Sequence, residues 1–290
     1  HFMYTKETYD AMDIAGKPDI LINDAGESVL NVLLEKHGKP KNKLSEIMEY
    51  KPKDAEDFTL RNLNMLDEPS GESVVRALDI LHKLGFIDSS NRPTRLGVLS
   101  EKVTRISQFG KKMVFSGVVY NISIKDLFIM VMLSEEKDTK GDYKHFDKID
   151  FVECLGKGKD FYPYILDQMI ERLILFYCFK RVLKTGVRKA KNWCASKGVG
   201  YKSMTESIGL VFDNIFNLKK LGFSYKGDKF IKQVDLLNES KDINAFMSYI
   251  KRVKMCIYQG YKYNLCTNVN GYYKTLYGKQ LEIPYPLHGD

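Results

Sequence analysis

The sequence lacks the short motifs that commonly mark a catalytic site. Its 290 residues hold no P-loop of the form G-x-x-x-x-G-K-[ST], no H-E-x-x-H pair and no G-x-S-x-G turn. The run Gly156–Asp160 alternates glycine and lysine, but the P-loop spacing is absent. The histidines are scattered, at His1, His37, His82, His145 and His288. We therefore expect no catalytic residue, no metal site and no cofactor within this chain.

Cysteine and unbroken apolar runs are also scarce. The cysteines are odd in number and form no close pair at metal-ligand spacing, which predicts packed, reduced thiols in a cytosol-like compartment. The most apolar stretch, residues 113–133, is interrupted by Asn121, Lys125 and Asp126, and this indicates a buried helix rather than a membrane span. Without a charged and then apolar leader, we expect an intracellular protein and no membrane partner. The five cysteines are Cys154, Cys178, Cys194, Cys256 and Cys266.

Positive charge is in excess over the whole chain. Lysine and arginine total 45 against 37 acidic residues, which gives a formal net charge of +8 and a pI near 9.0. This balance favours a polyanionic partner, with nucleic acid first and an anionic membrane as a weaker second. Charge alone does not specify the partner. The 44% hydrophobic and 28% charged residues are ordinary for a globular protein of one or a few domains.

Residues 74–106 carry a dense set of local folding signals. Apolar residues recur at helical spacing, and Gly85 can adopt the left-handed conformation that ends a helix. Phe86-Ile87 predicts a short strand, Ser89–Asn91 a turn, and Pro93-Thr94 an N-cap. The apolar face of the second helix would be formed by Leu96, Leu99, Val103 and Ile106. The stretch predicts a compact unit of helix, strand, turn and helix.

Helical periodicity recurs along the rest of the chain. It predicts helices over 27–34 ending near Gly38, over 113–120, and over 124–133 with Ser123 as N-cap. Further helices are expected over 164–183, 205–221 and 243–260. For the first of these, the apolar positions predict one buried side. Residues 272–283 predict a β-hairpin, residues 1–24 a strand with a connecting segment, and the charge-dense residues 135–148 a surface loop.

Several of these segments match the pattern of one family, in the same order. They are Met3–Glu7, Pro18–Ile20, Met65–Ser70, Arg76–Asp88, Arg92–Gly97, Ile124–Ser134, Trp193-Cys194 and Tyr273–Pro284. Together they resemble the winged-helix, ratchet and OB-fold segments of DEAH-box, RNA-helicase-A-like superfamily 2 helicases. The family's aspartate-histidine-leucine is replaced by Ile170–Arg172, its histidine is missing before Ile283-Pro284, and residues 135–159 match nothing in it. These departures indicate a distant branch, such as one from a large DNA virus.

The resemblance implies a mainly α fold with four parts. An exit segment from a motor domain would span 1–24, a winged-helix domain 25–108, a helical ratchet-like domain 109–254 and a partial OB-like segment 255–290. ATP and magnesium would be used by N-terminal RecA-like motor domains outside this chain, while this chain grips single-stranded RNA or DNA. The protein would be cytoplasmic or nuclear, or, if viral, in the host cytoplasm or the virion.

Basic residues follow the predicted helix at 164–183. Arg181, Lys184, Arg188 and Lys191 fall at steps of three and four, which places them on one side if the helix continues. Gly186 argues for a break within the run. The four residues are either a solvated face or a stripe that tracks phosphates, and the resemblance favours the stripe.

Tyrosines and lysines are interleaved in two further places. Tyr201-Lys202 follows a loop that contains Gly198 and Gly200. The predicted helix that carries Lys251, Arg252 and Lys254 leads into a C-terminal segment of basic and aromatic residues. Tyrosine rings can stack on unpaired bases while lysines hold the backbone, although half of these rings could equally be sheet core. The C-terminal segment contains Tyr258, Tyr261, Lys262, Tyr263, Tyr272, Tyr273, Lys274, Tyr277 and Lys279. The nucleic-acid-binding residues that we predict are Arg181, Lys184, Arg188, Lys191, Tyr201, Lys202, Lys262, Tyr273 and Lys274.

Two other functions fit the same residues. A stand-alone winged-helix factor of transcription or replication would use the same charge and tyrosines without a motor. A helical interaction scaffold would carry its positive charge incidentally, and its binding to single strands would be absent or insensitive to salt.

Overall fold

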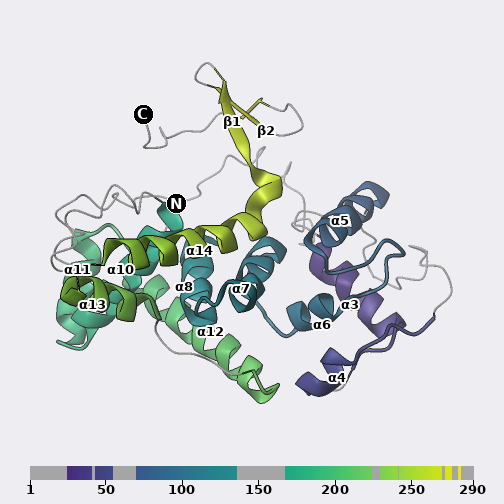
Figure 1. Cartoon of the computed structure of the whole chain (residues 1–290), viewed down its shortest axis with the longest axis horizontal. Helices are drawn as coiled ribbons and strands as arrows, with labels where there is room; N and C mark the ends of the chain where they lie inside the picture. Colours follow the sequence, from purple (N-terminus) through teal and green to yellow (C-terminus); the bar gives the residue numbers. More distant parts are fainter. Residues whose placement is uncertain are drawn as a thin grey trace, which may run out of the picture. The chain divides into compact units, whose positions relative to one another are not determined.

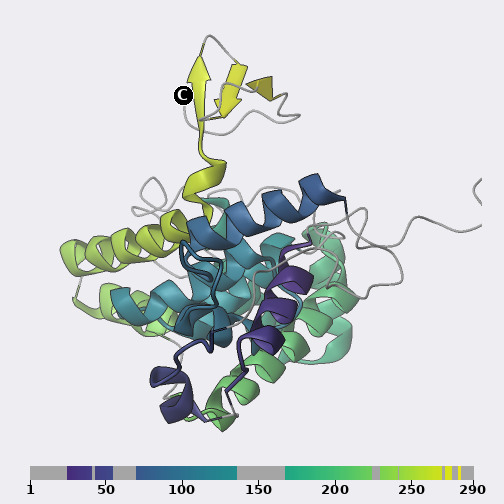
Figure 2. The same ribbon diagram turned by 90° about the vertical axis from the view of Figure 1, so that its right-hand side faces the viewer.

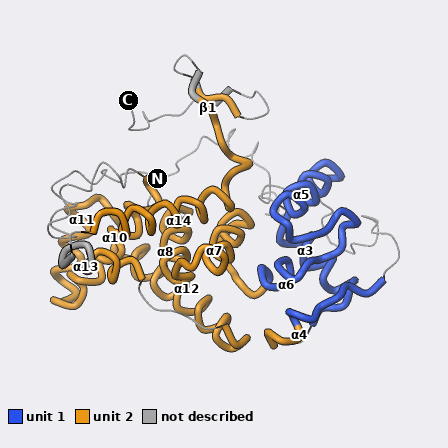
Figure 3. Tube along the Cα trace, in the orientation of Figure 1, with its two compact units in different colours: residues 1–41, 47–101 blue, residues 42–46, 102–290 orange. Residues whose placement is uncertain are grey.

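In the computed structural model, the chain forms two mostly helical compact units (Figure 1, Figure 3). Unit 1 contains residues 1–41 and 47–101, and unit 2 contains residues 42–46 and 102–290. The residues described are 25–40, 43–54, 70–135, 167–223, 229–240, 242–269, 272–275 and 280–281. The expectations for residues 1–24, 65–69 and 136–159 lie outside these ranges.

Unit 1 is built on three helices that share one apolar core. They are α3 (Gly26–Lys36), α5 (Gly71–Leu84) and α6 (Arg95–Glu101), and α3 packs against both others. A short helix, α4 (Leu44–Met48), crosses the boundary between the units. Fully buried side chains of unit 1 include Leu30, Leu33, Val74, Leu81, Leu84, Phe86 and Val98. The amphipathic helix predicted at 27–34 is confirmed, and Gly38 follows its end with φ +80°.

Capping and turn residues define the segment between α5 and α6. Gly85 ends α5 in the left-handed conformation, with φ 76°, and Ile87 forms a β-bridge with Pro93. Thr94 Oγ1 accepts a hydrogen bond from Gly97 N–H at 3.2 Å and donates one to Gly85 O at 2.7 Å. The predicted order of helix, strand, turn and helix is therefore confirmed, except that the predicted strand is a single β-bridge.

The second helix of this segment is shorter than the sequence predicts. α6 ends at Glu101, so Val103 and Ile106 are buried in a loop and not on the helix. The Thr104 N–H donates to Asn214 Oδ1 at 2.9 Å, and Asn214 Nδ2 donates to Thr104 O at 3.1 Å. The chain stops being helical because this side-chain pairing takes the backbone groups that a longer helix would use.

Unit 2 is a bundle of seven described helices. Its centre is α8 (Ile124–Glu135), which packs against α7 (Gln108–Tyr120), α10 (Gln168–Leu183) and α12 (Tyr201–Lys220). The others are α11 (Val187–Ser196), α13 (Lys229–Ser240) and α14 (Ile243–Tyr261), and α14 lies along α7. The mainly α fold is confirmed. In the part of the chain that the structure describes, none of the helices combines the length and hydrophobicity needed to span a membrane.

The centre of the bundle is apolar on nearly all sides. Every residue of α8 from Lys125 to Leu133 is buried, as are Ile170, Glu171 and Leu173–Phe179 of α10. The predicted core positions Leu173, Phe176 and Phe179 are buried, and burial extends beyond the predicted side because the helix is enclosed by its neighbours. The helix also begins at Gln168, where the Asp167 carboxylate accepts from the N–H groups of Met169 and Ile170.

One buried carboxylate joins three helices of this bundle. Asp126 of α8 is 1% exposed, and the Tyr177 hydroxyl of α10 donates to its Oδ1 at 2.5 Å. The Phe230 N–H of α13 donates to its Oδ2 at 3.1 Å. Burial, and after it the charge of Asp126, raises the pKa of Tyr249 on α14. Asp126 thus satisfies donors from elements that are far apart in the sequence.

The C-terminal elements correct several predicted boundaries. α12 begins at Tyr201 and not near 205, α13 was not predicted, and α14 extends to Tyr261. Tyr258 lies on α14, as the predicted helix implied, and Tyr261 is the last residue of this helix. A 3₁₀ turn, η4 (Lys262–Asn264), then leads into a three-stranded sheet.

The sheet contains the predicted hairpin and one further strand. β2 (Tyr272–Thr275) pairs antiparallel with β3 (Gln280–Leu281), with Tyr273 opposite Leu281. β1 (Cys266–Val269), which the sequence analysis missed, pairs antiparallel with the other edge of β2. Figures 1 and 2 both show the sheet beyond the C-terminal end of α14.

The cysteines agree with the prediction only in part. Cys194, Cys256 and Cys266 are free, but Cys178 is disulfide-bonded, so the prediction that all five are reduced is wrong. Burial raises the pKa of Cys194 to about 11 and that of Cys256 to about 12. These two thiols are packed and stay protonated at neutral pH.

Candidate nucleic-acid interface

The four predicted basic residues do not share one continuous helix. α10 ends at Leu183, and Gly186, with φ 132°, separates it from α11. Arg181 and Lys184 therefore belong to the end of α10, whereas Arg188 and Lys191 lie on α11. The helix does not continue through residue 191, so the spacing does not place the four residues on one side of a single helix. All four side chains are nevertheless exposed.

α11 is held in place by its apolar side. Ala190 and Cys194 are buried, and the Trp193 ring lies 6.3 Å from the ring of Phe179 on α10. The Phe179 ring also meets Tyr201 edge to face at 5.9 Å. Packing through Phe179 thus brings the basic side of α11 next to the start of α12.

Two predicted residues from different helices meet at this point. The ammonium group of Lys191 lies 5.5 Å from the ring centroid of Tyr201, within the range of a cation–π contact. The neighbouring Lys202 is exposed and lies 3.7 Å from the Glu206 carboxylate. Because this exposed ion pair is weak, Lys202 remains able to exchange its partner for a phosphate.

The remaining basic residues of this region have no acidic partner among the described residues. No described carboxylate lies within ion-pair distance of Arg181, Lys184, Arg188 or Lys191. Their charges are therefore available to an anion from solution. We name this set the α11 surface: Arg181, Lys184, Arg188, Lys191, Tyr201 and Lys202.

The three predicted C-terminal residues lie elsewhere in unit 2. Lys262 on η4 places its ammonium group 5.0 Å from the ring centroid of Tyr263. Tyr273 and Lys274 are consecutive on β2, so their side chains point to opposite faces of the sheet. Lys274 is exposed and Tyr273 is half-buried. These two residues cannot both contact a ligand on one face.

The structure therefore places the nine predicted residues in two regions. Figure 1 shows α11 at one end of unit 2, away from the sheet that follows α14. Sequence reasoning left out Lys251 and Lys254, which lie on exposed positions of α14, and did not consider Lys112. The helix predicted over 243–260 already held Lys251, Lys254 and Tyr258 at helical steps, so this signal was present in the sequence.

Among the described residues, no group of acidic, histidine and cysteine side chains could hold a metal ion. The α11 surface combines ammonium and guanidinium groups with the ring of Tyr201. Such a surface can bind phosphates and stack on bases.

The chain is similar to proteins of African swine fever virus that carry a helicase name. It is 21% identical over 293 residues to "Putative RNA Helicase B962L" of African swine fever virus, from a Malawi tick isolate. The proteins of the same name from a Kenya pig isolate and a South African tick isolate are each 20% identical. Each match covers 91% of this chain and 29% of the relative, so the chain spans less than a third of the length of these relatives. No protein-family model matches the chain.

Proposed function

We propose that this chain is the C-terminal nucleic-acid-gripping module of an NTP-dependent, DEAH-like helicase. The observation that carries this proposal is the similarity to viral proteins with a helicase name. The similarity extends over 91% of this chain but over only 29% of the viral protein. A match of this kind is expected for an accessory region. The RecA-like motor domains, with ATP and magnesium, would then lie in the remainder of the protein.

The local structure of each region is compatible with this assignment. The helix, bridge and helix of residues 71–101 support a winged-helix domain within 25–108. The bundle supports a ratchet-like domain over 109–254, and the small antiparallel sheet supports an OB-like segment within 255–290. In this proposal the protein acts in the host cytoplasm or nucleus, or within the virion.

The α11 surface would bind a nucleic-acid strand without recognising its base sequence. Its cations would neutralise phosphates, and Tyr201 would offer a ring on which an unpaired base can stack. Neither contact distinguishes one base from another. The module would therefore hold single-stranded RNA or DNA of any sequence while the motor supplies the work.

Binding of labelled single strands across a salt series tests the proposal. Replacing Lys184, Arg188 and Lys191 together by glutamine should weaken binding and lower the slope of log K against log salt by about 2, because about 0.7 is lost for each phosphate contact. The matched control replaces Lys51, Lys53 and Lys232, three exposed lysines outside this surface. An unchanged slope would remove the three residues from the interface. Binding by the natural chain that is absent or insensitive to salt would overturn the proposed function.

A further inference from the structure

The exposed side of α14 carries a regular stripe of basic and aromatic residues. Lys251, Lys254 and Tyr258 follow one another at steps of three and four, and Lys262 on η4 continues the series. At about 1.5 Å of rise per residue, consecutive members are about 4.5 to 6 Å apart along the axis. The opposite side of the helix is buried through Phe246, Tyr249, Ile250, Val253 and Cys256. The stripe is therefore held rigidly by the bundle.

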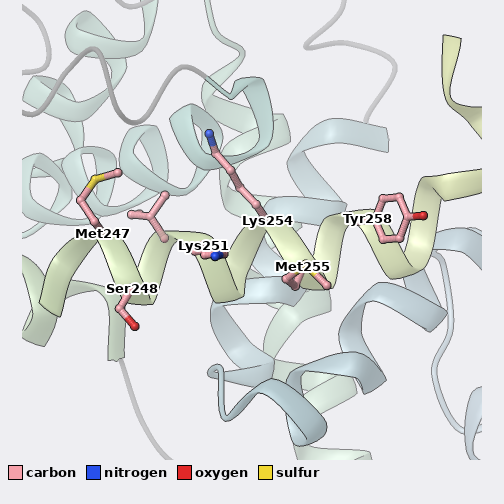
Figure 4. Close-up of a pocket in the computed structure, with 7 residues that line it drawn as sticks. Met247, Ser248, Lys251, Lys254, Met255 and Tyr258 are labelled. Carbon is pink, nitrogen blue, oxygen red and sulfur yellow. The ribbon is translucent and has the colours of Figure 1, made fainter. Parts of the chain in front are cut away.

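A hollow of about 700 Å³ lies along this side of the helix. Figure 4 shows Lys251, Lys254 and Tyr258 projecting from successive turns of α14. The Tyr258 ring is 45% exposed and Met255 is 37% exposed, so both can be reached by a planar ligand. The described residues that line the hollow are Met247, Ser248, Ile250, Lys251, Lys254, Met255 and Tyr258.

A second observation concerns Lys112 and Lys262, at the end of this stripe. Lys112 on α7 has its pKa lowered, first by burial and then by the positive charge of Lys262. The two ammonium groups are brought together because Gly260 lets α14 approach α7 closely. A Cβ at position 260 would lie 2.7 Å from Phe109 O and 2.8 Å from Met113 Cβ.

Among the described residues, no carboxylate pairs with either of these two lysines. The nearby Glu135 carboxylate already accepts hydrogen bonds from Ser107 and from the Tyr261 hydroxyl. The described structure thus places two ammonium groups close to each other with no described carboxylate bound to them, and a bound phosphate would relieve their repulsion.

We propose that the α14 stripe, defined as Lys251, Lys254, Tyr258, Lys262 and Lys112, is a second binding surface for single-stranded nucleic acid. The ammonium groups hold successive phosphates, and the Tyr258 ring stacks on an unpaired base between them. The inference rests on the proposed function, but it concerns a surface distinct from the α11 surface. The α14 stripe would extend the binding surface for the strand along α14 toward the sheet.

The geometry favours a nucleic acid over two other anionic partners. A membrane-bound amphipathic helix inserts its apolar side into lipid, but the apolar side of α14 is packed inside the bundle. An acidic peptide would satisfy the lysines, but it would leave the exposed Tyr258 ring without a stacking partner. A strand supplies both charges and rings at a spacing that matches a single helix face.

Two variants of the full chain test this surface. Lys251→Gln with Lys254→Gln should weaken single-strand binding about 10-fold and lower the salt slope by about 1.4. Tyr258→Ala should weaken binding roughly 10-fold with no change in salt slope, and Tyr258→Phe should restore it, because stacking needs the ring and not the hydroxyl. The control removes the same charge with Lys51→Gln and Lys232→Gln. Circular dichroism checks that each variant is folded.

Photo-crosslinking gives an independent readout. A strand that carries 4-thiouridine or bromodeoxyuridine should crosslink to the natural chain at or beside Tyr258, as mapped by mass spectrometry. One outcome would overturn this inference and leave the proposed function standing. In that outcome the natural chain binds single strands and the α11 substitutions weaken this binding, but both α14 variants bind normally and no crosslink maps to α14. If the natural chain binds no strand and its α14 side instead binds polyglutamate or phosphatidylserine vesicles, both fail.

Discussion

The two units of this protein reach their folds by different kinds of interaction. In unit 1, the hydrogen bonds that end α5 and begin α6 join residues close in sequence, as where Thr94 bonds to Gly85 and Gly97. In unit 2, the defining contacts join distant residues, as where Asp126 accepts from Tyr177 and from Phe230. Local signals can be recognised in a sequence, but a buried carboxylate that joins helices cannot. The bundle is therefore the part that sequence reasoning describes less well.

The largest effect that would sharpen this comparison is expected at Asp126. Asp126→Ala should lower the free energy of unfolding of unit 2 by about 3 kcal/mol, because it leaves two buried donors without an acceptor. Urea unfolding, with hydrogen exchange of α8, α10 and α13, measures the loss. Tyr177→Phe is the control, since it removes one donor and keeps the stacked ring of Phe230 at 6.1 Å, and it should cost about 1 kcal/mol. Equal losses in the two variants would show that Asp126 is not a shared acceptor.

A smaller effect, confined to unit 1, is expected at Gly97. A Cβ at this position would lie 2.1 Å from the carbonyl oxygen of Phe86, so the backbone must move. Gly97→Ala should destabilise unit 1 by about 2 kcal/mol, with faster hydrogen exchange across α5 and α6.

Gly209 on α12 offers a matched control for this substitution. No atom lies within 4 Å of a Cβ built there, so Gly209→Ala should be neutral or slightly stabilising. If exchange in unit 2 rose as much as in unit 1 after Gly97→Ala, the division into separately stabilised units would be wrong.

The smallest effect depends on pH and should appear in unit 2 alone. Burial, and then the charge of Asp167, raises the pKa of Glu171 on α10 to about 7, against an ordinary value of 4.5. The folded state thus binds this proton more tightly than the unfolded state. The resulting stability is fully present below pH 4.5 and is lost as the pH rises through 7.

Glu171→Gln should therefore stabilise unit 2 at pH 8 by about 1 kcal/mol and flatten its stability between pH 4.5 and 7. Denaturant unfolding at a series of pH values measures the difference. Asp167→Asn keeps an N-cap oxygen and should lower the pKa of Glu171. A pH profile unaltered by either substitution would contradict the assignment.

Much of the fold could be predicted because helices have local signatures. Gly85 and Thr94 identified the ends of α5 and α6, and Ser123 identified the start of α8, where its Oγ accepts from Asp126 N–H at 3.3 Å. The errors in the predicted helices arose where contacts with residues distant in the sequence decide the structure. α6 is shortened by the Asn214 side chain, and α10 is enclosed because other helices cover what would otherwise be its polar side.

The binding surfaces were predictable only as a list of exposed cations. The spacing along one assumed helix grouped Arg181 with Lys191. In the structure, Lys191 on α11 instead contacts Tyr201 on the next helix, α12. Lys112 carried no signal in the sequence, because its closeness to Lys262 depends on how two helices pack at Gly260. Which charges act together is a property of tertiary packing.

The break between α10 and α11 has a consequence for how this sequence can diverge. Gly186 is exposed, and no atom would obstruct a side chain there, so a solvent-facing position of this kind would ordinarily accept many residues. Its backbone at φ 132° and ψ 148° belongs instead to a region that is essentially restricted to glycine. Among relatives that keep this bend, position 186 should therefore remain glycine.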